Sequence, residues 1–239
     1  MIETIRLSLF IASIATVATF ILGILFAEIT TRKKTVWMNI LEFIILFPLA
    51  IPPTVMGFYT ITVLGNNGLF AKFFNISPNI LFTPTANIIV GIIASLPIMY
   101  RAIRISFDSI STDIIDATKL DTSSPFCILM NIKIPLAYKG ILAGILLSFL
   151  RVLGEFGASL MVSGNIKGYT QTIPISIWEA VMNNDLYLAN IQTMFLIILS
   201  FSMLIIVNLV SSNKEQMTFQ NIKMPKFTIF TKLKVGRNI

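Results

Sequence analysis

Five long apolar stretches dominate the chain and limit what it can fold into. Each is about 20 residues long or longer, which is the length of helix needed to cross a hydrocarbon core about 30 Å thick. They cover approximately residues 7–27, 36–63, 80–100, 139–162 and 189–210. Because a bilayer offers the backbone no hydrogen-bond partners, such segments cross it as helices. The sequence therefore predicts an all-α integral membrane protein with five transmembrane helices.

Prolines interrupt the second and third stretches. The second contains Pro48, Pro52, Pro53 and Gly57, and the third is expected to end at Pro97. A proline leaves a helix carbonyl without its donor, which a membrane segment tolerates only where neighbouring helices or water satisfy it. We therefore expect the second segment to be a broken span that lies against other helices or water.

The composition removes most classes of enzyme. The chain has no histidine and a single cysteine, Cys127, so a zinc site or an internal disulfide has too few ligands. It also lacks the GxxxxGKS or GxxxxGKT phosphate-binding loop and the HExxH metalloprotease motif. We therefore predict no catalytic residue, no metal ligand and no cofactor bound by this chain. Any energy source must be another protein or an ion gradient.

The basic residues predict the orientation of the chain. If the Arg-Lys-Lys connection at 32–34 is cytoplasmic, fourteen of the 18 lysines and arginines fall on the cytoplasmic side, three fall outside, and Arg151 lies in the membrane. The positive-inside rule then places the N-terminus outside and the C-terminus in the cytoplasm. Topology thus explains the net charge of +7, and nucleic acid is not an expected partner.

An arginine and a glutamate lie inside the fourth stretch, in RVLGEFGASLM at 151–161. Intramembrane ions are costly and usually mark a pathway or a contact. On one continuous helix they share a sector of about 120° with the small and polar side chains. That face comprises Gly140, Gly144, Ser148, Arg151, Gly154, Glu155 and Ala158. Arg151 and Glu155 are close enough to pair. The face either lines or gates a polar route, or only packs against another helix.

A loop of about 38 residues, 101–138, separates the third and fourth stretches. Asp113, Asp116 and Asp121 flank a short apolar face, and a Ser-Ser-Pro turn precedes a second apolar segment, 126–130. This pattern predicts two short helices. The first either offers a face to a cytoplasmic partner or folds against its own bundle.

This loop resembles the EAA motif of the permeases of ATP-binding-cassette (ABC) importers. Asp116, Ala117 and Thr118 occupy the EAA positions, Thr122 replaces the usual glycine, and a closing Ile-Lys-Ile-Pro ends at Pro135 with the spacing of the motif. Threonine enters a left-handed turn less readily than glycine. The resemblance implies an ATPase-coupling loop that contains Asp116, Ala117, Thr118, Leu120, Thr122, Ile132 and Pro135.

Longer stretches narrow the resemblance to ModB-type molybdate permeases. They are RVLGEFGASLMVSGNIKGYTQTIPISIW, LFPLAIPPTVMGFY and LPIMYRAIRISFDSI. The implied function is import of an oxyanion, molybdate or tungstate, by alternating access driven by a separate ATPase. Sulfate or thiosulfate is the alternative substrate, because sulfate permeases share the GEFGA-like segment. A secondary carrier is a further alternative, but the chain has no convincing inverted repeat.

The resemblance also implies an architecture and partners. Residues 1–212 form the permease domain of a type I importer, including the coupling loop at 105–135. Residues 213–239 extend beyond the resemblance, and their six basic residues predict a cytoplasmic tail that attracts anionic lipid or contacts the ATPase or a regulator. Two copies of the chain, two ATPase subunits that hold ATP and magnesium, and an extracytoplasmic molybdate-binding protein assemble in the bacterial cytoplasmic membrane. The second and fourth spans lie at the pathway. The implied pathway or gate residues are Pro52, Pro53, Ser148, Arg151, Gly154, Glu155 and Gly157.

Overall fold

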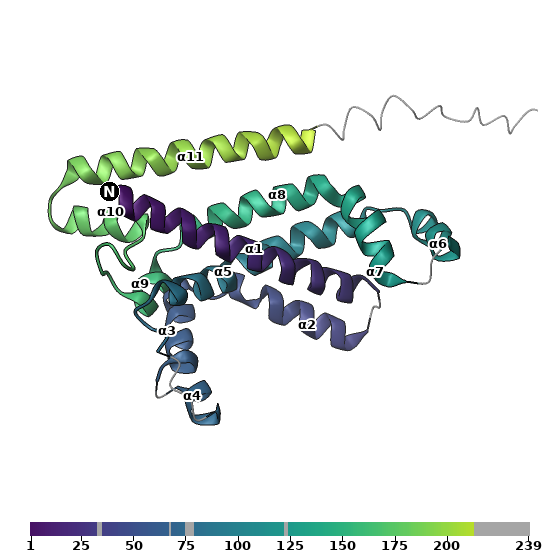
Figure 1. Cartoon of the computed structure of the whole chain (residues 1–239), viewed down its shortest axis with the longest axis horizontal. Helices are drawn as coiled ribbons and strands as arrows, with labels where there is room; N and C mark the ends of the chain where they lie inside the picture. The colour runs from purple at the N-terminus through teal and green to yellow at the C-terminus, as the bar shows by residue number, and fades with distance from the viewer. Residues whose placement is uncertain (33–34, 67, 75–78, 122–123, 213–239) are drawn as a thin grey trace, which may run out of the picture.

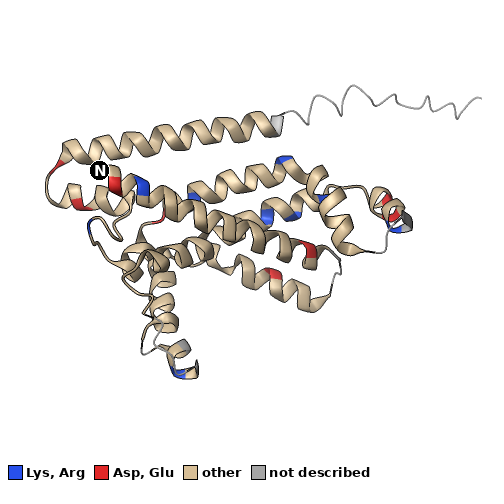
Figure 2. Cartoon of the chain, viewed as in Figure 1, with Lys and Arg blue, Asp and Glu red and all other residues tan. Residues whose placement is uncertain are grey.

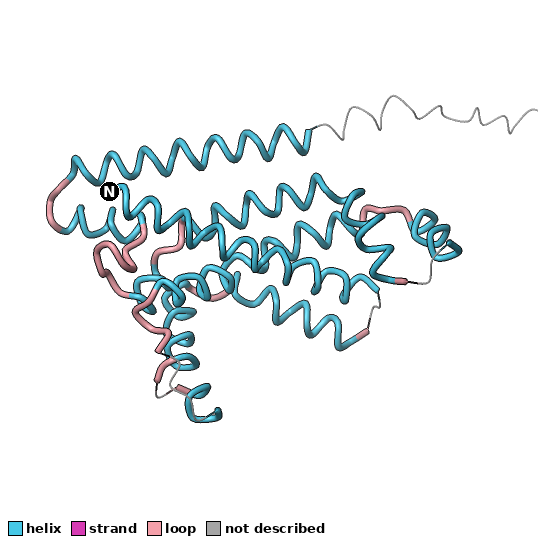
Figure 3. Tube along the Cα trace, viewed as in Figure 1, coloured by secondary structure: helices cyan, strands magenta, loops and turns pink. Residues whose placement is uncertain are grey.

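The computed structural model describes residues 1–32, 35–66, 68–74, 79–121 and 124–212, and every regular element in these ranges is a helix (Figure 3). The helices are α1 (Ile2–Arg32), α2 (Val36–Leu46), η1 (Phe47–Leu49), α3 (Pro53–Leu64), α4 (Leu69–Phe74), α5 (Pro84–Asp108), α6 (Thr112–Asp121), α7 (Pro125–Ile128), η2 (Leu129–Lys133), α8 (Ile134–Leu153), α9 (Gly157–Ser163), α10 (Ile173–Met182) and α11 (Leu186–Ser212). η1 is a 3-10 helix and η2 is a π-helix. The predicted all-α class is confirmed.

Three long helices, α1, α5 and α8, pack together as the centre of the bundle (Figure 1). Met99, Tyr100 and Ile103 of α5 are fully buried between them. Small residues permit the close approach: a Cβ atom on Gly144 of α8 would lie 2.8 Å from the Cβ of Ala102 on α5. Gly144, on the small and polar face of the fourth segment, thus packs against α5 of the same chain.

The lengths of the apolar helices agree with a multi-pass membrane protein. Four segments are long and apolar enough to cross a bilayer: Ile2–Thr31, Pro84–Asp108, Pro125–Leu153 and Leu186–Val210. A bent pair, α2 with η1 and then α3, supplies a fifth if it counts as one span. Charged residues lie mainly towards the two ends of the bundle, and few occur in its middle (Figure 2).

The predicted second span is two helices that meet at 114°. Pro52 has an extended backbone, with ψ at 140°, and Pro53 begins α3. Two adjacent residues without N–H groups cannot continue the ladder of α2, so the chain turns. As a result α3 leaves the direction of the bundle and packs against α9 (Figure 1).

The third and fourth spans also have bounds that differ from those predicted. α5 runs through Pro97, which is buried, and continues to Asp108. The spanning helix of the fourth segment starts at Pro125 rather than near Lys139, and it ends at Leu153. The continuous helix predicted over 139–162 is therefore wrong, because Gly154 ends α8 and a separate α9 follows.

The segments expected in the cytoplasm share one end of the bundle. The end of α1, the α6–α7 region and the end of α11 all lie at the right of Figure 1, and the N-terminus lies at the left. This arrangement agrees with the topology given by the basic residues. The orientation relative to a membrane stays a prediction, and the basic tail at 213–239 lies outside the described residues.

Candidate functional site

The segment that resembles the EAA motif protrudes from one end of the bundle. α6 packs chiefly against α7 and stands apart from the long helices (Figure 1). Asp116 and Lys119 form an exposed ion pair, with Oδ1 and Nζ 2.7 Å apart, and Ala117 is exposed beside them. Thr118 is half-buried, and its hydroxyl donates to the carbonyl of Ile114 over 2.6 Å. The two predicted short helices are confirmed.

Two predicted members of this loop are only partly placed. Leu120 belongs to α6, although its side chain is outside the described part of the structure, and Thr122 lies outside the described residues. Ile132 is half-buried in η2 and Pro135 is exposed. The second short helix, α7, does not end in a loop but continues through η2 into α8.

A π-turn joins the protruding helices to α8. The N–H of Ile134 donates to the carbonyl of Leu129, five residues back, which is the π pattern. Pro135 follows at once as the second residue of α8. Because Pro135 has no N–H to donate, an unbroken α-helix through this point would leave a carbonyl unpaired. The wider turn therefore lies directly before the proline that closes the EAA-like segment.

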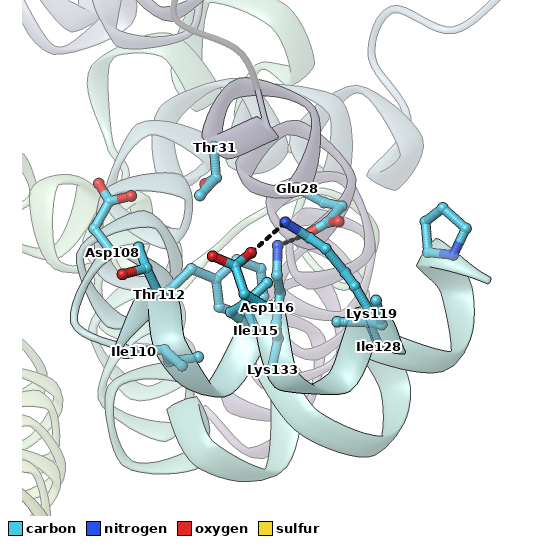
Figure 4. Close-up of a pocket in the computed structure, with 12 residues that line it drawn as sticks. Glu28, Thr31, Asp108, Ile110, Thr112, Ile115, Asp116, Lys119, Ile128 and Lys133 are labelled. Atoms are coloured by element: carbon cyan, nitrogen blue, oxygen red, sulfur yellow. Dashed lines mark hydrogen bonds and ion pairs between the residues drawn. The ribbon is translucent and has the colours of Figure 1, made fainter. Parts of the chain in front are cut away.

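A cavity of about 700 Å³ lies beneath α6 (Figure 4). Its walls come from the ends of α1 and α5 and from α6, α7 and η2. Its charged lining consists of Glu28, Asp108, Asp116, Lys119 and Lys133. α6 thus covers an open space rather than a close-packed core.

A buried ion pair crosses the inner side of this cavity. Lys133 Nζ donates to Glu28 Oε2 over 2.7 Å, and each side chain is only 10% exposed. Glu28 belongs to α1 and Lys133 ends η2, so the pair joins elements 105 residues apart. The Lys133 ammonium also lies 5.6 Å from the centre of the Phe107 ring on α5. The sequence signalled this pair only weakly, through Glu28 near a span end and Lys133 before Pro135.

The second ionic site lies where α8 gives way to α9. Arg151 Nη1 donates to Glu155 Oε2 over 2.7 Å, so the predicted pairing is confirmed. The other Glu155 oxygen, Oε1, accepts the N–H of Ala158 over 3.1 Å and caps the first turn of α9. The side chain of Glu155 is 2% exposed, whereas that of Arg151 is 31% exposed. The carboxylate therefore holds the helix break together while the guanidinium reaches an open surface.

The structure brings together some predicted pathway residues but not all. A Cβ atom on Gly157 would lie 3.4 Å from the Cβ of Pro53, so the second and fourth segments meet at the α3–α9 crossing. Pro52 and Gly154 are exposed nearby on these segments. Ser148 instead lies fully buried within the chain, and its hydroxyl has no hydrogen-bond partner among the described residues.

The end of the bundle that holds the N-terminus carries a buried polar network that sequence reasoning missed. Asn87 at the start of α5 donates to the carbonyl of Thr170 and accepts the Ser163 hydroxyl, over 3.1 and 2.7 Å. The Thr170 hydroxyl donates to the Ser163 carbonyl over 2.9 Å. These bonds fix the 164–172 loop to α5 and α9. The sequence signal was weak, because the partners are 76 and 83 residues apart.

A surface ion pair ties the same loop to α10. Glu179 Oε1 lies 3.2 Å from Lys167 Nζ, and Gln171 also donates to Glu179. Burial raises the pKa of Glu179, but the hydrogen bonds from Lys167 and Gln171 and the attraction of the Lys167 charge lower it by more. The pKa of Glu179 therefore lies below its usual value of 4.5.

Residues 19–215 match the family described as "Binding-protein-dependent transport system inner membrane component". The chain belongs to this family. It is 34% identical over 200 residues to the putative molybdenum transport system permease protein YvgM of Bacillus subtilis (strain 168), covering 83% of this chain and 88% of that protein. It is 32% identical over 184 residues to the molybdenum transport system permease protein ModB of Haemophilus influenzae, covering 75% and 80%.

More distant proteins extend the comparison. A probable sulfate transport system permease protein, cysT, of Marchantia polymorpha is 26% identical over 198 residues, covering 82% of this chain and 69% of that one. Among solved structures, the crystal structure of a bacterial alginate ABC transporter has a chain that aligns with a TM-score of 0.70 at 14% identity, covering 91% of this chain and 79% of that one. At that identity, the likeness shows the fold.

Membership of the family confirms the coarse functional predictions. The chain is a multi-pass inner-membrane component of a binding-protein-dependent transport system, and its fold is that of an ABC importer permease. It is the membrane component, so ATP hydrolysis belongs to a separate ATPase and substrate capture to a binding protein. The roles of individual residues stay predictions.

Proposed function

We propose that this chain is the permease subunit of a molybdate importer. The observation that carries the proposal is its 34% identity, over most of both chains, to a putative molybdenum permease. In this proposal two copies form the pathway, and an extracytoplasmic binding protein delivers the oxyanion. Two ATPase subunits hold ATP and magnesium, and this chain binds no cofactor.

The ATPase is proposed to dock on α6 and α7. The support is geometric: α6 protrudes from the bundle end, exposes Asp116, Ala117 and Lys119, and covers a cavity rather than a packed core. Movement of this segment would pass directly into α8, because α7, η2 and α8 are continuous. Closure of the ATPase pair could then reorient the spans without covalent chemistry in the permease.

The pathway is proposed to run beside the α8–α9 break and the start of α3. Arg151 is partly exposed there, and Gly154, Pro52 and Pro53 present small or rigid surfaces. Glu155 neutralises part of the Arg151 charge, so a passing dianion would be attracted weakly and released. The exposed apolar faces of α2, α3 and α11 would be covered by the second copy and by lipid.

A transport assay with purified components tests the substrate. The permease and its ATPase are reconstituted in vesicles with the binding protein, and titration calorimetry compares binding of molybdate, tungstate and sulfate to the binding protein. We expect tight binding of molybdate, weak binding of sulfate, and ATP-dependent uptake of molybdate. Preferential binding and uptake of sulfate would instead mean that this chain is a sulfate permease, as the more distant relative is named.

Two variants test the proposed docking segment. Asp116→Lys reverses the exposed charge of α6, and Pro135→Ala restores an N–H that lets the π-turn relax. Both should lower transport per ATP hydrolysed while the protein stays in the membrane. Normal transport by both variants would contradict the docking assignment. Lys139→Ala, a nearby basic residue in α8, serves as the control.

A further inference from the structure

The Glu28–Lys133 ion pair lies where three elements meet. Glu28 belongs to the last turns of α1, Lys133 is the last residue of η2, and Phe107, near the end of α5, faces the Lys133 ammonium. Both charged side chains are nine-tenths buried. A buried lysine without its carboxylate is strongly unfavourable, so the pair holds these elements in one arrangement.

Lys133 points inward from the π-turn. Its neighbours Asn131 and Pro135 are exposed and Ile132 is half-buried, whereas Lys133 is 8% exposed as a residue. π-turns inside helices are costly and often occur at functional sites. Here the extra residue brings a cation from the base of the protruding helices into contact with α1 (Figure 4).

We propose that Glu28 and Lys133 are positioning residues that lock α1 to the base of the α6–η2 segment. A displacement of that segment reaches α8 through continuous helix, and through the ion pair it also reaches α1, which has no covalent link to it nearby. The long helices α1 and α8 then move as one unit. This inference rests on the proposed docking of an ATPase on α6 and α7.

The first test measures oxyanion transported per ATP hydrolysed, using the complete complex of permease, ATPase and binding protein. Glu28→Gln keeps the size of the side chain and removes its charge. We expect the ratio to fall roughly 3- to 30-fold. The matched control is Glu42→Gln, because Glu42 also pairs across helices, with Arg101 and Arg104, at the same end of the bundle. An unchanged ratio in Glu28→Gln would overturn the proposal.

A charge-swapped variant separates positioning from general packing. Lys133→Glu combined with Glu28→Lys restores an ion pair in reverse order. In complexes that assemble, the double variant should therefore recover most of the transport per ATP hydrolysed that Glu28→Gln loses. Loss of packing alone predicts no recovery. A swapped variant that assembles but couples no better than Glu28→Gln would therefore contradict a role for the pair.

A second measurement needs no oxyanion. Spin labels at Ile29→Cys on α1 and Leu136→Cys on α8, both exposed sites, are placed in a Cys127→Ser background because Cys127 is exposed. In protein with Glu28 intact, the distance between the two labels should be the same before and after ATP and vanadate bind to the ATPase. In the Glu28→Gln variant, the distribution of this distance should shift or broaden when they bind. An identical response in both would overturn the proposal. If the complex transports no oxyanion, the proposed function is wrong, and this separation still decides the role of the pair.

Discussion

Two ion pairs whose carboxylates are buried, Arg151–Glu155 and Glu28–Lys133, differ in what they connect. Arg151 and Glu155 are four residues apart and join the end of α8 to the start of α9. Glu28 and Lys133 are 105 residues apart and join α1 to the base of the protruding helices. In the first pair the cation is 31% exposed, whereas in the second both partners are 10% exposed.

This difference teaches that a local pair and a distant pair perform different tasks in a membrane bundle. One Glu155 oxygen accepts a hydrogen bond from Arg151 and the other accepts one from the N–H of Ala158, so Glu155 stabilises the local break between α8 and α9. Lys133 has its carboxylate on another helix, so it fixes how two elements lie relative to one another. Breaking the distant pair should therefore have the larger consequence.

The largest expected effect is that of Lys133→Glu. Two carboxylates would face each other at a nine-tenths buried site, which should cost about 3–5 kcal/mol. Thermal unfolding in detergent and the amount of protein in the membrane measure the loss. Arg151→Glu makes the equivalent reversal at the local pair and should cost less, because the side chain at position 151 is 31% exposed and can turn away from Glu155. Equal losses would remove the distinction between the two pairs.

A smaller loss is expected from Glu155→Ala. The variant leaves Arg151 without its carboxylate and the Ala158 N–H without its acceptor, at about 1–3 kcal/mol for the orphaned groups. Transport should fall more than in Phe156→Ala, the adjacent half-buried residue that contacts Trp178. Glu155→Gln should retain part of the activity, since its amide oxygen can still cap α9. If Phe156→Ala lowered transport as much as Glu155→Ala, Glu155 would contribute only to helix packing.

Gly57→Val tests the helix crossing beside the local pair. A Cβ atom at Gly57 would lie 2.8 Å from the Cβ of Met161 and 3.0 Å from the Cα of Ala158, so the substitution must push α3 from α9. Overpacking of this kind costs about 1–3 kcal/mol. The control, Gly154→Ala, meets nothing closer than the Leu150 carbonyl at 3.5 Å. Thermal stability should fall in the first variant only.

The smallest effect concerns the pH dependence of the 164–172 loop. Because the pKa of Glu179 is lowered on folding, its pairing with Lys167 stabilises the loop above the ordinary pKa of 4.5, and this contribution is lost as pH falls through the lowered value. Lys167 is largely exposed, so the contribution is about 0.2–1 kcal/mol. Hydrogen exchange of the 164–172 loop should accelerate in acid, and Glu179→Gln should remove that dependence.

Local patterns in the sequence were sufficient for much of the fold. Apolar length predicted the helical membrane class, i,i+4 spacing predicted the Arg151–Glu155 pair, and the loop composition predicted α6 and α7. All three depend on residues close together in the chain. Hydropathy alone could not place the break after Leu153, because it depends on the side chain of Glu155 capping the next helix.

Features that depend on residues far apart in the sequence could not be predicted. A proline inside an apolar run could end a helix, as was expected of Pro97, or be tolerated, as the structure shows for α5. The outcome depends on neighbouring helices rather than on the local sequence. The same holds for the partner of Lys133, which only the packing of α1 against the other helices reveals.

The π-turn has a consequence for how the protein tolerates insertions and deletions. An α-helix advances about 100° per residue, so removing one residue from the α-helical part of α8 would rotate everything before it by about that angle around the helix axis. The outward face of α6 would then point sideways, although every side chain in it were unchanged. A π-turn holds one residue more than an α-turn, so a one-residue deletion within Leu129–Lys133 can be absorbed by a return to α-helix.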